Sequence, residues 1–279
     1  TLPPAAPRLA RPPRRAAPPK LPPRLFPAPP RLADPAQPRY LDDSALETPT
    51  LALADAARET LRMGDMVETM LRLVMEAMLT NNRALVDQVT ATDNSVDSLN
   101  EAIKLYLTKL TRGSLDESEG KRAMEIISFT INLEHVGDIL DKNLSELAAK
   151  KIKRRWQFSP EGAAELSAFH QRIHQSLRMA FGVFMSGDVN EARKLLIEKA
   201  ELRNIELAAI ERHLDRLREQ QTAALETTSL HLDVLRDLRR IHSHICSVAY
   251  PVLDRSGETD PALAIERRPV ALAVGPASN

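Results

Sequence analysis

The chain has 279 residues, of which 43% are hydrophobic, and this suffices for one or two domains with a sizeable core. Acidic and basic residues are equal in number, 38 each, but residues 1–40 hold eight basic residues and one acidic residue. The rest of the chain is therefore acidic, which argues against nucleic-acid binding. No apolar run approaches the ~20 residues that a transmembrane helix needs, so we expect no membrane span in this chain.

Proline separates the start of the chain from the rest, because fifteen of the twenty prolines lie in the first 49 residues. A segment of this composition cannot build a core, and we interpret residues 1–45 as a disordered linker rich in Pro and Arg. It has no apolar stretch typical of a signal peptide. Two roles stay open for its basic residues: a solubilising spacer, or a tether near anionic lipid.

Three helices are predicted after this linker. Apolar or small residues recur every three or four positions from Leu53 to Met78, and two asparagines then interrupt the pattern. A second helix ends around Gly113, where glycine suits a C-terminal cap. The third spans about Asp116 to Arg154 and has a basic last turn that complements the helix dipole.

Three more helices follow. Ser159 and Pro160 form an N-capping signature, and the new helix continues to about Met185. After a break at Gly187, a fifth helix runs to about residue 220, and a sixth runs from near residue 222 to Pro251.

An offset of about 106 residues superposes the second set of helices on the first, which indicates an internal duplication. We predict an all-α fold of two tandem three-helix bundles that stack on each other. The expected first repeat covers residues 46–155, the second covers residues 156–254, and residues 255–279 form a disordered tail.

Two pairs of carboxylates form a candidate metal site. Asp93 and Asp97 lie four residues apart on the second helix, and Glu134 and Asp138 are spaced in the same way on the third, so each pair shares a helix face. If these helices are neighbours, the four side chains can hold a metal ion or cluster of Fe, Mn, Mg or Zn. Asp93 falls on the apolar seam of its helix, where a solvated aspartate is not expected. The alternative is that the other three form ordinary salt bridges.

The second repeat replaces these carboxylates. The matched positions hold Lys199, Arg203, Arg239 and Ser243, so this repeat cannot form the same metal site. Its basic surface leaves three roles open: pairing with acidic residues, binding an anion, or docking a partner.

Motifs of known enzymes are missing from the chain. There is no glycine-rich phosphate loop and no Gly-x-Ser-x-Gly elbow, and the Glu-x-x-His motif of di-iron bundles is absent. His170 and His174 have the spacing of metal ligands, but two histidines alone are a weak signal. We expect no enzyme, no catalytic residue and no organic cofactor.

Nine short strings, spread over about residues 38–254, carry a family pattern. They are Pro38-Arg-Tyr-Leu-Asp42, Leu46-Glu-Thr-Pro49, Ala56-Ala-Arg-Glu59, Leu99-Asn-Glu-Ala-Ile-Lys-Leu-Tyr-Leu107, Asn132-Leu-Glu-His-Val-Gly-Asp-Ile139, Ala148-Ala-Lys-Lys-Ile-Lys153, Phe184-Met-Ser-Gly187, Glu211-Arg-His-Leu214 and Ala249-Tyr-Pro-Val-Leu253. These strings resemble the PhoU-like C-terminal domain of bacterial sodium/phosphate cotransporters, and the duplicated unit with its acidic pairs more distantly resembles the PhoU regulator.

This resemblance implies a cytoplasmic regulatory domain of a sodium-dependent phosphate transporter, involved in phosphate uptake and homeostasis at the inner face of the bacterial plasma membrane. Its implied partner is a membrane transporter domain, either upstream in the same chain or separate, and a homo-oligomer is left open. PhoU proteins bind metal clusters through acidic motifs in both repeats, whereas only the first repeat matches here. The alternative is a free-standing helical scaffold, or a PhoU-type regulator of phosphate signalling without a transport role.

Overall fold

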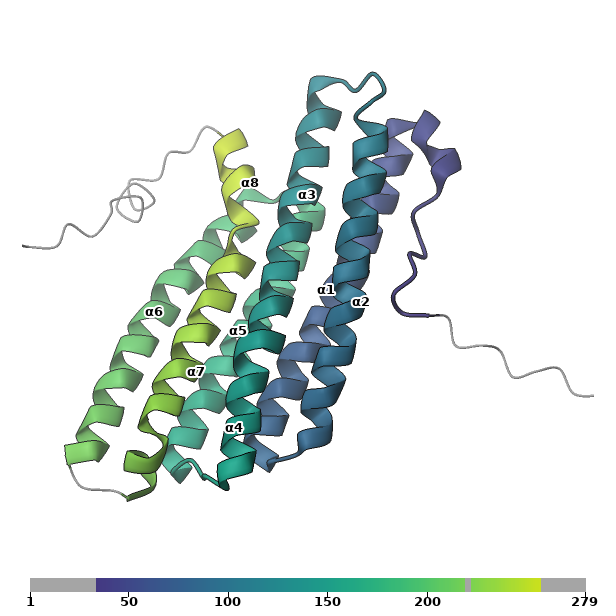
Figure 1. Cartoon of the computed structure of the whole chain (residues 1–279). Helices are drawn as coiled ribbons and strands as arrows, with labels where there is room; N and C mark the ends of the chain where they lie inside the picture. Colours follow the sequence, from purple (N-terminus) through teal and green to yellow (C-terminus); the bar gives the residue numbers. More distant parts are fainter. Residues whose placement is uncertain (1–33, 219–221, 257–279) are drawn as a thin grey trace, which may run out of the picture. The chain divides into compact units, whose positions relative to one another are not determined.

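The computed structural model describes residues 34–218 and 222–256, and the described residues from Pro35 onward belong to one compact unit (Figure 1). No strand occurs in the described ranges, so the predicted all-α class is confirmed. The elements are η1 (Asp43–Glu47), α1 (Pro49–Thr80), α2 (Arg83–Leu110), α3 (Glu117–Asp138), η2 (Ile139–Ser145), α4 (Glu146–Arg154), α5 (Pro160–Ser186), α6 (Val189–Arg218), α7 (Thr222–Cys246) and α8 (Ala249–Arg255).

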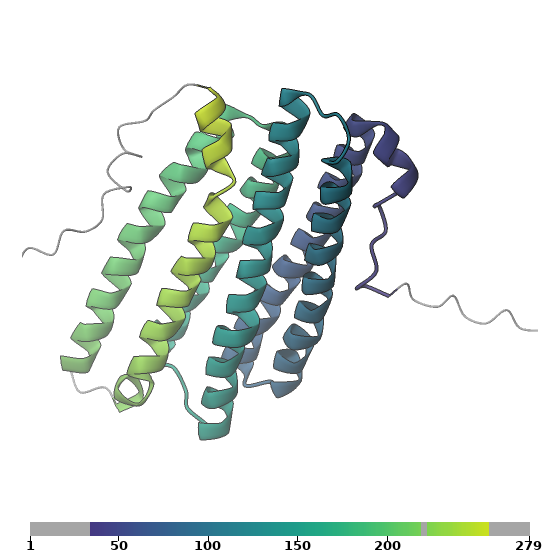
Figure 2. The ribbon, with the colours of Figure 1, turned by 45° about the horizontal axis from the view of Figure 1, so that its top comes forward.

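The long helices form two bundles of three, as predicted. In the first bundle α1, α2 and α3 contact one another, and in the second α5, α6 and α7 do the same. The bundles meet where α1 packs on α5 and α3 packs on α7, which the two ribbon views show from different directions (Figures 1 and 2). This arrangement places α2 and α3 beside each other, as the candidate metal site requires.

Aromatic side chains join the two bundles through a continuous apolar core. Phe129 of α3 packs against Phe184 and Phe181 of α5, with ring centroids 4.6 and 6.4 Å apart. A Cβ atom at Gly64 would lie 2.7 Å from the Phe181 ring, so glycine lets α1 approach α5 closely. None of the described helices combines the length and apolar character needed to cross a membrane.

Helix ends agree with the prediction in two places and differ in two. Asn81 ends α1 in a left-handed conformation (φ 57°), and Gly187 does so after α5 (φ 63°). Gly113 lies beyond the end of α2 and does not adopt positive φ, because Thr111 already caps that helix through its backbone N–H. Pro251 does not end the sixth helix. It lies in the first turn of α8, where a missing N–H breaks no helical bond.

The predicted third helix is interrupted by a π-helical segment. Residues Ile139–Ser145 form η2 between α3 and α4, so the residues after Asp138 are turned away from the face that an uninterrupted α-helix would give them. Lys151, one of the residues of the expected basic last turn, is buried. Its Nζ donates to Oδ1 of Asn81 over 2.7 Å, and burial lowers its pKa.

Part of the expected linker packs against the first bundle. The buried carboxylate of Glu59 accepts hydrogen bonds from the backbone N–H groups of Arg39 and Tyr40, at 2.8 and 2.7 Å. Residues 35–45 therefore lie against α1, because backbone donors of this segment supply partners for a carboxylate inside the bundle. The remainder of the expected linker and almost all of the expected tail lie outside the described residues.

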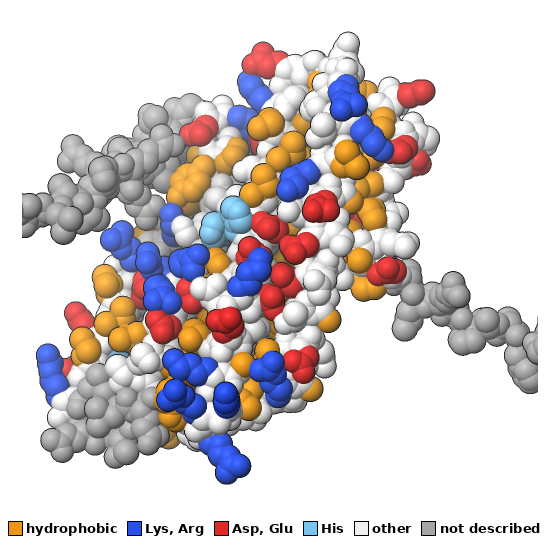
Figure 3. Space-filling model, viewed as in Figure 1, with side chains coloured by type: hydrophobic (Ala, Val, Ile, Leu, Met, Phe, Trp, Pro, Cys, Tyr) orange, Lys and Arg blue, Asp and Glu red, His pale blue; other side chains and the backbone are white. Residues whose placement is uncertain are grey.

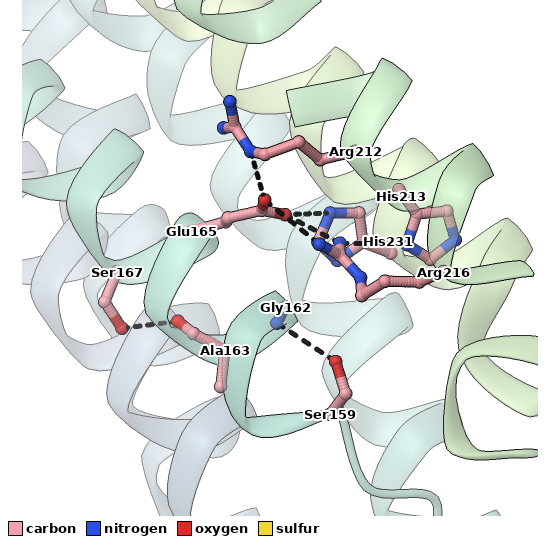
Figure 4. A network of polar contacts seen from close by, with 9 residues as sticks. All are labelled: Ser159, Gly162, Ala163, Glu165, Ser167, Arg212, His213, Arg216 and His231. Atoms are coloured by element: carbon pink, nitrogen blue, oxygen red, sulfur yellow. Dashed lines mark hydrogen bonds and ion pairs between the residues drawn. The ribbon is translucent and has the colours of Figure 1, made fainter. Parts of the chain in front are cut away.

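A polar network fixes the end of the second bundle (Figure 4). Glu165 of α5 accepts hydrogen bonds from Arg212 and Arg216 of α6, each at 2.7 Å, and these arginines hold its pKa below the usual range against the opposing effect of burial. The buried rings of His213 and His231 stack beside this pair with centroids 4.5 Å apart. The network ties α5, α6 and α7 together next to the one internal gap in the described chain.

Candidate metal centre

Three of the four predicted carboxylates come together on one face of the first bundle. Asp93 and Asp97 extend from α2, Asp138 is the last residue of α3, and one oxygen of each lies within 4.8 Å of the others. Figure 3 shows this region as a group of acidic side chains over α2 and α3. The i, i+4 spacing of the two α2 residues and the packing of α2 on α3 account for the convergence.

Asp93 is the buried member of the group, and its environment is unusual for a carboxylate. Its side chain is 5% exposed, and Oδ1 has no hydrogen-bond partner among the described residues. Burial, and then repulsion from Asp97, Asp141 and Asp138, raise its pKa to about 7, although Lys142 opposes this effect. An orphaned buried oxygen is costly unless something compensates it.

The other two carboxylates are partly exposed, and a lysine partly neutralises them. Lys142 donates to Oδ1 of Asp138, and this hydrogen bond raises the lysine pKa. Burial and then repulsion from Asp138 raise the pKa of Asp97. One cation beside three carboxylates leaves the group with an excess of negative charge when all three are ionised.

Glycine at position 137 makes room for the buried carboxylate. A Cβ atom built there would lie 2.8 Å from Oδ1 of Asp93, which is closer than real Cβ atoms come to a neighbouring atom, and 3.4 Å from a Val96 methyl group. The absence of a side chain at Gly137 therefore keeps the Asp93 oxygen in place while α3 lies directly against α2.

Glu134, the fourth predicted ligand, does not join this three-residue group. Its Oε2 lies 3.7 Å from Nε2 of His135, whose ring packs edge-on against His244 of α7 with centroids 5.1 Å apart. His244 in turn bonds Oδ1 of Asn132 through Nδ1 over 2.9 Å. Glu134 thus lies one helical turn before Asp138, next to the contact between the two repeats.

Asp141 is a member of the acidic environment that the sequence prediction missed. It lies in the π-helical segment, raises the pKa of Asp93, and accepts a hydrogen bond from Thr90 of α2 over 2.6 Å. Its position three residues after Asp138 was the available signal. Two acidic residues at this spacing share a helix face even without the π-helical segment.

The donor set fits a hard divalent cation. Three carboxylate oxygens in a group, one of them buried with no partner in the described part of the chain, match the ligands that Mg²⁺ and Mn²⁺ prefer. The space at Gly137 fits as well, because any larger residue would displace a candidate ligand atom. His170 and His174 lie elsewhere: His170 bonds the backbone carbonyl of Leu71 and His174 pairs with Glu68, which gives these histidines other roles.

Substitution of Gly137 by Ala is expected to weaken metal binding about tenfold while changing the free energy of unfolding by less than about 1 kcal/mol. The new methyl group displaces the Asp93 oxygen, but the gain in helix propensity offsets the strain. Isothermal titration with Mn²⁺ and urea unfolding measure the two effects. Gly120→Ala is the matched control on α3, where a Cβ meets nothing within 4 Å, and equal affinities in both variants would contradict the expectation.

The second repeat brings its matched residues together too. Lys199 and Arg203 of α6 and Arg239 and Ser243 of α7 line one cavity, together with Leu202 and His242. The helix pair that carries the acidic group in the first repeat thus carries a basic group in the second. The two repeats therefore share the arrangement of this helix pair, but the charge of the side chains at the matched positions is reversed.

The chain is similar in sequence to curated bacterial proteins that share one name. The chain is 41% identical over 231 residues to a protein of Escherichia coli (strain K12) named "Putative inorganic phosphate export protein YjbB", and 42% identical over 234 residues to the protein of that name from Salmonella typhimurium. Each match covers 83% of this chain and 42% of the relative. The chain therefore spans less than half the length of the curated relatives it matches.

Solved structures of PhoU share the fold. Those from Pseudomonas aeruginosa and Streptococcus pneumoniae both superpose with a TM-score of 0.67, at 20% and 15% sequence identity. They cover 74% and 76% of this chain and 98% and 99% of their own length. The PhoU domain model matches residues 60–146 and 166–252, one segment in each bundle, and with the close relatives this shows that the chain belongs to the PhoU domain family.

Proposed function

We propose that this chain is a non-enzymatic regulatory domain that controls phosphate movement by a bacterial membrane transporter. The observation that carries the proposal is the acidic group of the first repeat, in which a buried Asp93 oxygen finds no hydrogen-bond partner among the described residues of a PhoU-family bundle. Such a group costs free energy when empty, so its presence favours a bound cation.

Asp93, Asp97 and Asp138 are the proposed metal ligands, and Glu134, one helical turn before Asp138, is the fourth candidate. A bound divalent cation supplies positive charge that offsets the repulsion between these carboxylates. The ligands come from α2 and α3, and α3 also contacts α7. Binding of the cation therefore fixes two helices whose packing reaches the second bundle.

The proposed partner is a sodium-dependent phosphate-transporting membrane domain, with this chain on the cytoplasmic side of the bacterial plasma membrane. The relatives are more than twice as long as the segment that matches, which leaves room in them for such a domain. Their printed name concerns phosphate export, whereas the sequence resemblance implied uptake. We therefore propose regulation of phosphate movement without fixing its direction.

The test is phosphate transport in cells that produce the complete gene product. Radiolabelled phosphate is loaded, and its cellular content and efflux are measured for wild type and for the double variant Asp97→Asn, Asp138→Asn. A changed flux in the double variant is expected. Asp87→Asn is the control, because this exposed α2 aspartate pairs with Arg83 outside the acidic group. An unchanged flux, with normal protein levels, would favour the alternative of a helical scaffold or signalling regulator without a transport role.

A further inference from the structure

A cavity of about 190 Å³ lies between α6 and α7 in the second bundle. It is lined by Lys199, Leu202, Arg203, Arg239, His242 and Ser243. This volume is large enough for several water molecules or a small polyatomic ion. Figure 3 shows basic side chains gathered over α6 and α7, on the same face of the molecule as the acidic group of the first bundle.

The charge of the cavity wall is mainly positive. Lys199, Arg203 and Arg239 contribute three cations, and the buried carboxylate of Glu206 pairs with Arg239 over 3.1 Å. Glu206 has a raised pKa because of burial, although Arg239 and Arg203 oppose this effect. Nζ of Lys199 is held by the Tyr250 hydroxyl over 2.8 Å, so the ammonium has a fixed place at the wall.

Neutral hydrogen-bonding groups complete the wall. His242 is 2% exposed, and its Nε2 bonds the Ser176 hydroxyl over 2.9 Å. Burial, and then the positive charges of Lys199 and Arg172, lower its pKa to about 4, so the ring is neutral at pH 7. His242 and Ser243 both line the cavity, so they add an imidazole and a hydroxyl group to its wall.

Two arginines, a lysine, a hydroxyl and a neutral imidazole form a donor set that suits a tetrahedral oxyanion. Guanidinium groups bind phosphate oxygens in pairs, and an ammonium adds a point charge. We propose that the cavity binds a small phosphate-type oxyanion, with inorganic phosphate as the ligand. The choice of phosphate among oxyanions rests on the proposed function, whereas the site itself rests on the cavity and its charges. One chain then carries a cation site and an anion site at equivalent positions of its two repeats.

Binding is tested by isothermal titration of inorganic phosphate into the full chain, once without treatment and once after EDTA treatment, with chloride at the same ionic strength as the blank. Arg203→Gln is expected to weaken binding about tenfold, because one charge-assisted contact is lost. Glu206→Gln is expected to strengthen binding, because it removes the carboxylate next to the cations while keeping an oxygen that accepts from Arg239. The control Arg218→Gln makes the same charge change on α6, in an exposed pair with Asp215 outside the cavity.

Saturable phosphate binding that persists in EDTA and follows this order of variants would support the inference. Equal phosphate affinity in Arg203→Gln and Arg218→Gln, or no binding by wild type, would overturn it. Binding that disappears on EDTA treatment would also overturn it, because phosphate would then be held by metal in the first repeat. That last result leaves the proposed metal-dependent regulation standing, so the two proposals fail separately.

Discussion

Chain purified without chelators is expected to contain a divalent metal ion, and the double variant Asp97→Asn, Asp138→Asn is expected to have lost it. The substitutions keep the size of both side chains but remove two of the three converging carboxylates. A site left with one carboxylate should bind the ion more than about a hundredfold less tightly. Elemental analysis by mass spectrometry identifies the metal and its amount per chain.

The same ion should stabilise the fold. A ligand present at about a thousand times its dissociation constant contributes about 4 kcal/mol to the free energy of unfolding. For a domain of this size, such a loss lowers the melting temperature by roughly 10 °C. EDTA is therefore expected to lower the melting temperature of wild type by about this amount and to leave the double variant unchanged.

Asp87→Asn controls for the loss of negative charge on α2, because Asp87 is exposed and lies outside the acidic group. This variant should keep its metal and its response to EDTA. The site would be ruled out by two results together. Wild type would have to be metal-free after purification without chelators, and its melting temperature would have to stay unchanged when Mn²⁺, Mg²⁺, Fe²⁺ or Zn²⁺ is added.

The sequence predicted the helices well because their signals are local. Apolar positions recur with the helical period from Leu53 to Met78, and Ser159 caps α5 by accepting from Gly162 over 3.1 Å, as its position before Pro160 predicts. The internal repeat then supplied the arrangement of the helices. A unit that occurs twice must bury the same face twice, which limits the possible packings.

The differences arise where distant contacts override local pattern. Lys151 belongs to a basic stretch that suggests solvent, yet Asn81, seventy residues earlier, accepts its hydrogen bond inside the protein. The π-helical segment after Asp138 has no proline or glycine within it. A periodicity count therefore finds no local signal for this interruption of the helix.

The candidate site was predictable in its helix faces but not in its detail. The i, i+4 pairs predicted which residues share a face, and α2 does pack on α3. Asp141 affects the pKa of Asp93. Its direction from the helix axis depends on the π-helical segment in which it lies, and the spacing of residues in the sequence does not predict that segment. The pairing of Lys142 with Asp138 likewise depends on side-chain positions that spacing alone leaves open.

A second large effect is expected from Asp93→Asn in EDTA-treated protein, which should be about 2 kcal/mol more stable than wild type at pH 8. The wild-type carboxyl has a pKa of about 7 in the folded chain and an ordinary value of 3.8 when unfolded. Between these values the folded state binds more protons than the unfolded state, so ionisation of Asp93 as the pH rises destabilises the fold. The figure of about 2 kcal/mol is smaller than the free energy that corresponds to the full pKa shift, because water near the carboxyl group screens part of the effect.

The comparison of the two proteins isolates Asp93 from the other titrating groups. The buried rings of His231 and His242 have pKa values of about 4, below the ordinary histidine value of 6.5. Their contribution to the stability of the fold is therefore complete above pH 6.5 and is lost as the pH falls from 6.5 toward 4. Both proteins contain these histidines, and their contributions cancel in the difference. Urea unfolding should therefore give nearly equal free energies at pH 4 and a gap between the two proteins that widens as the pH rises toward 7 and stays constant above it.

Metal should reverse this order at pH 8. A cation binds the ionised carboxylate and competes with the proton, so its affinity for wild type should fall as the pH drops below about 7. With saturating metal, wild type should then be the more stable protein at pH 8, whereas Asp93→Asn should respond little. The proposal that Asp93 is a metal ligand would be contradicted if the difference in free energy of unfolding between the two proteins did not change with pH. It would also be contradicted if saturating metal did not reverse the sign of this difference. The reversal would show that the unpartnered oxygen is costly only while the site is empty.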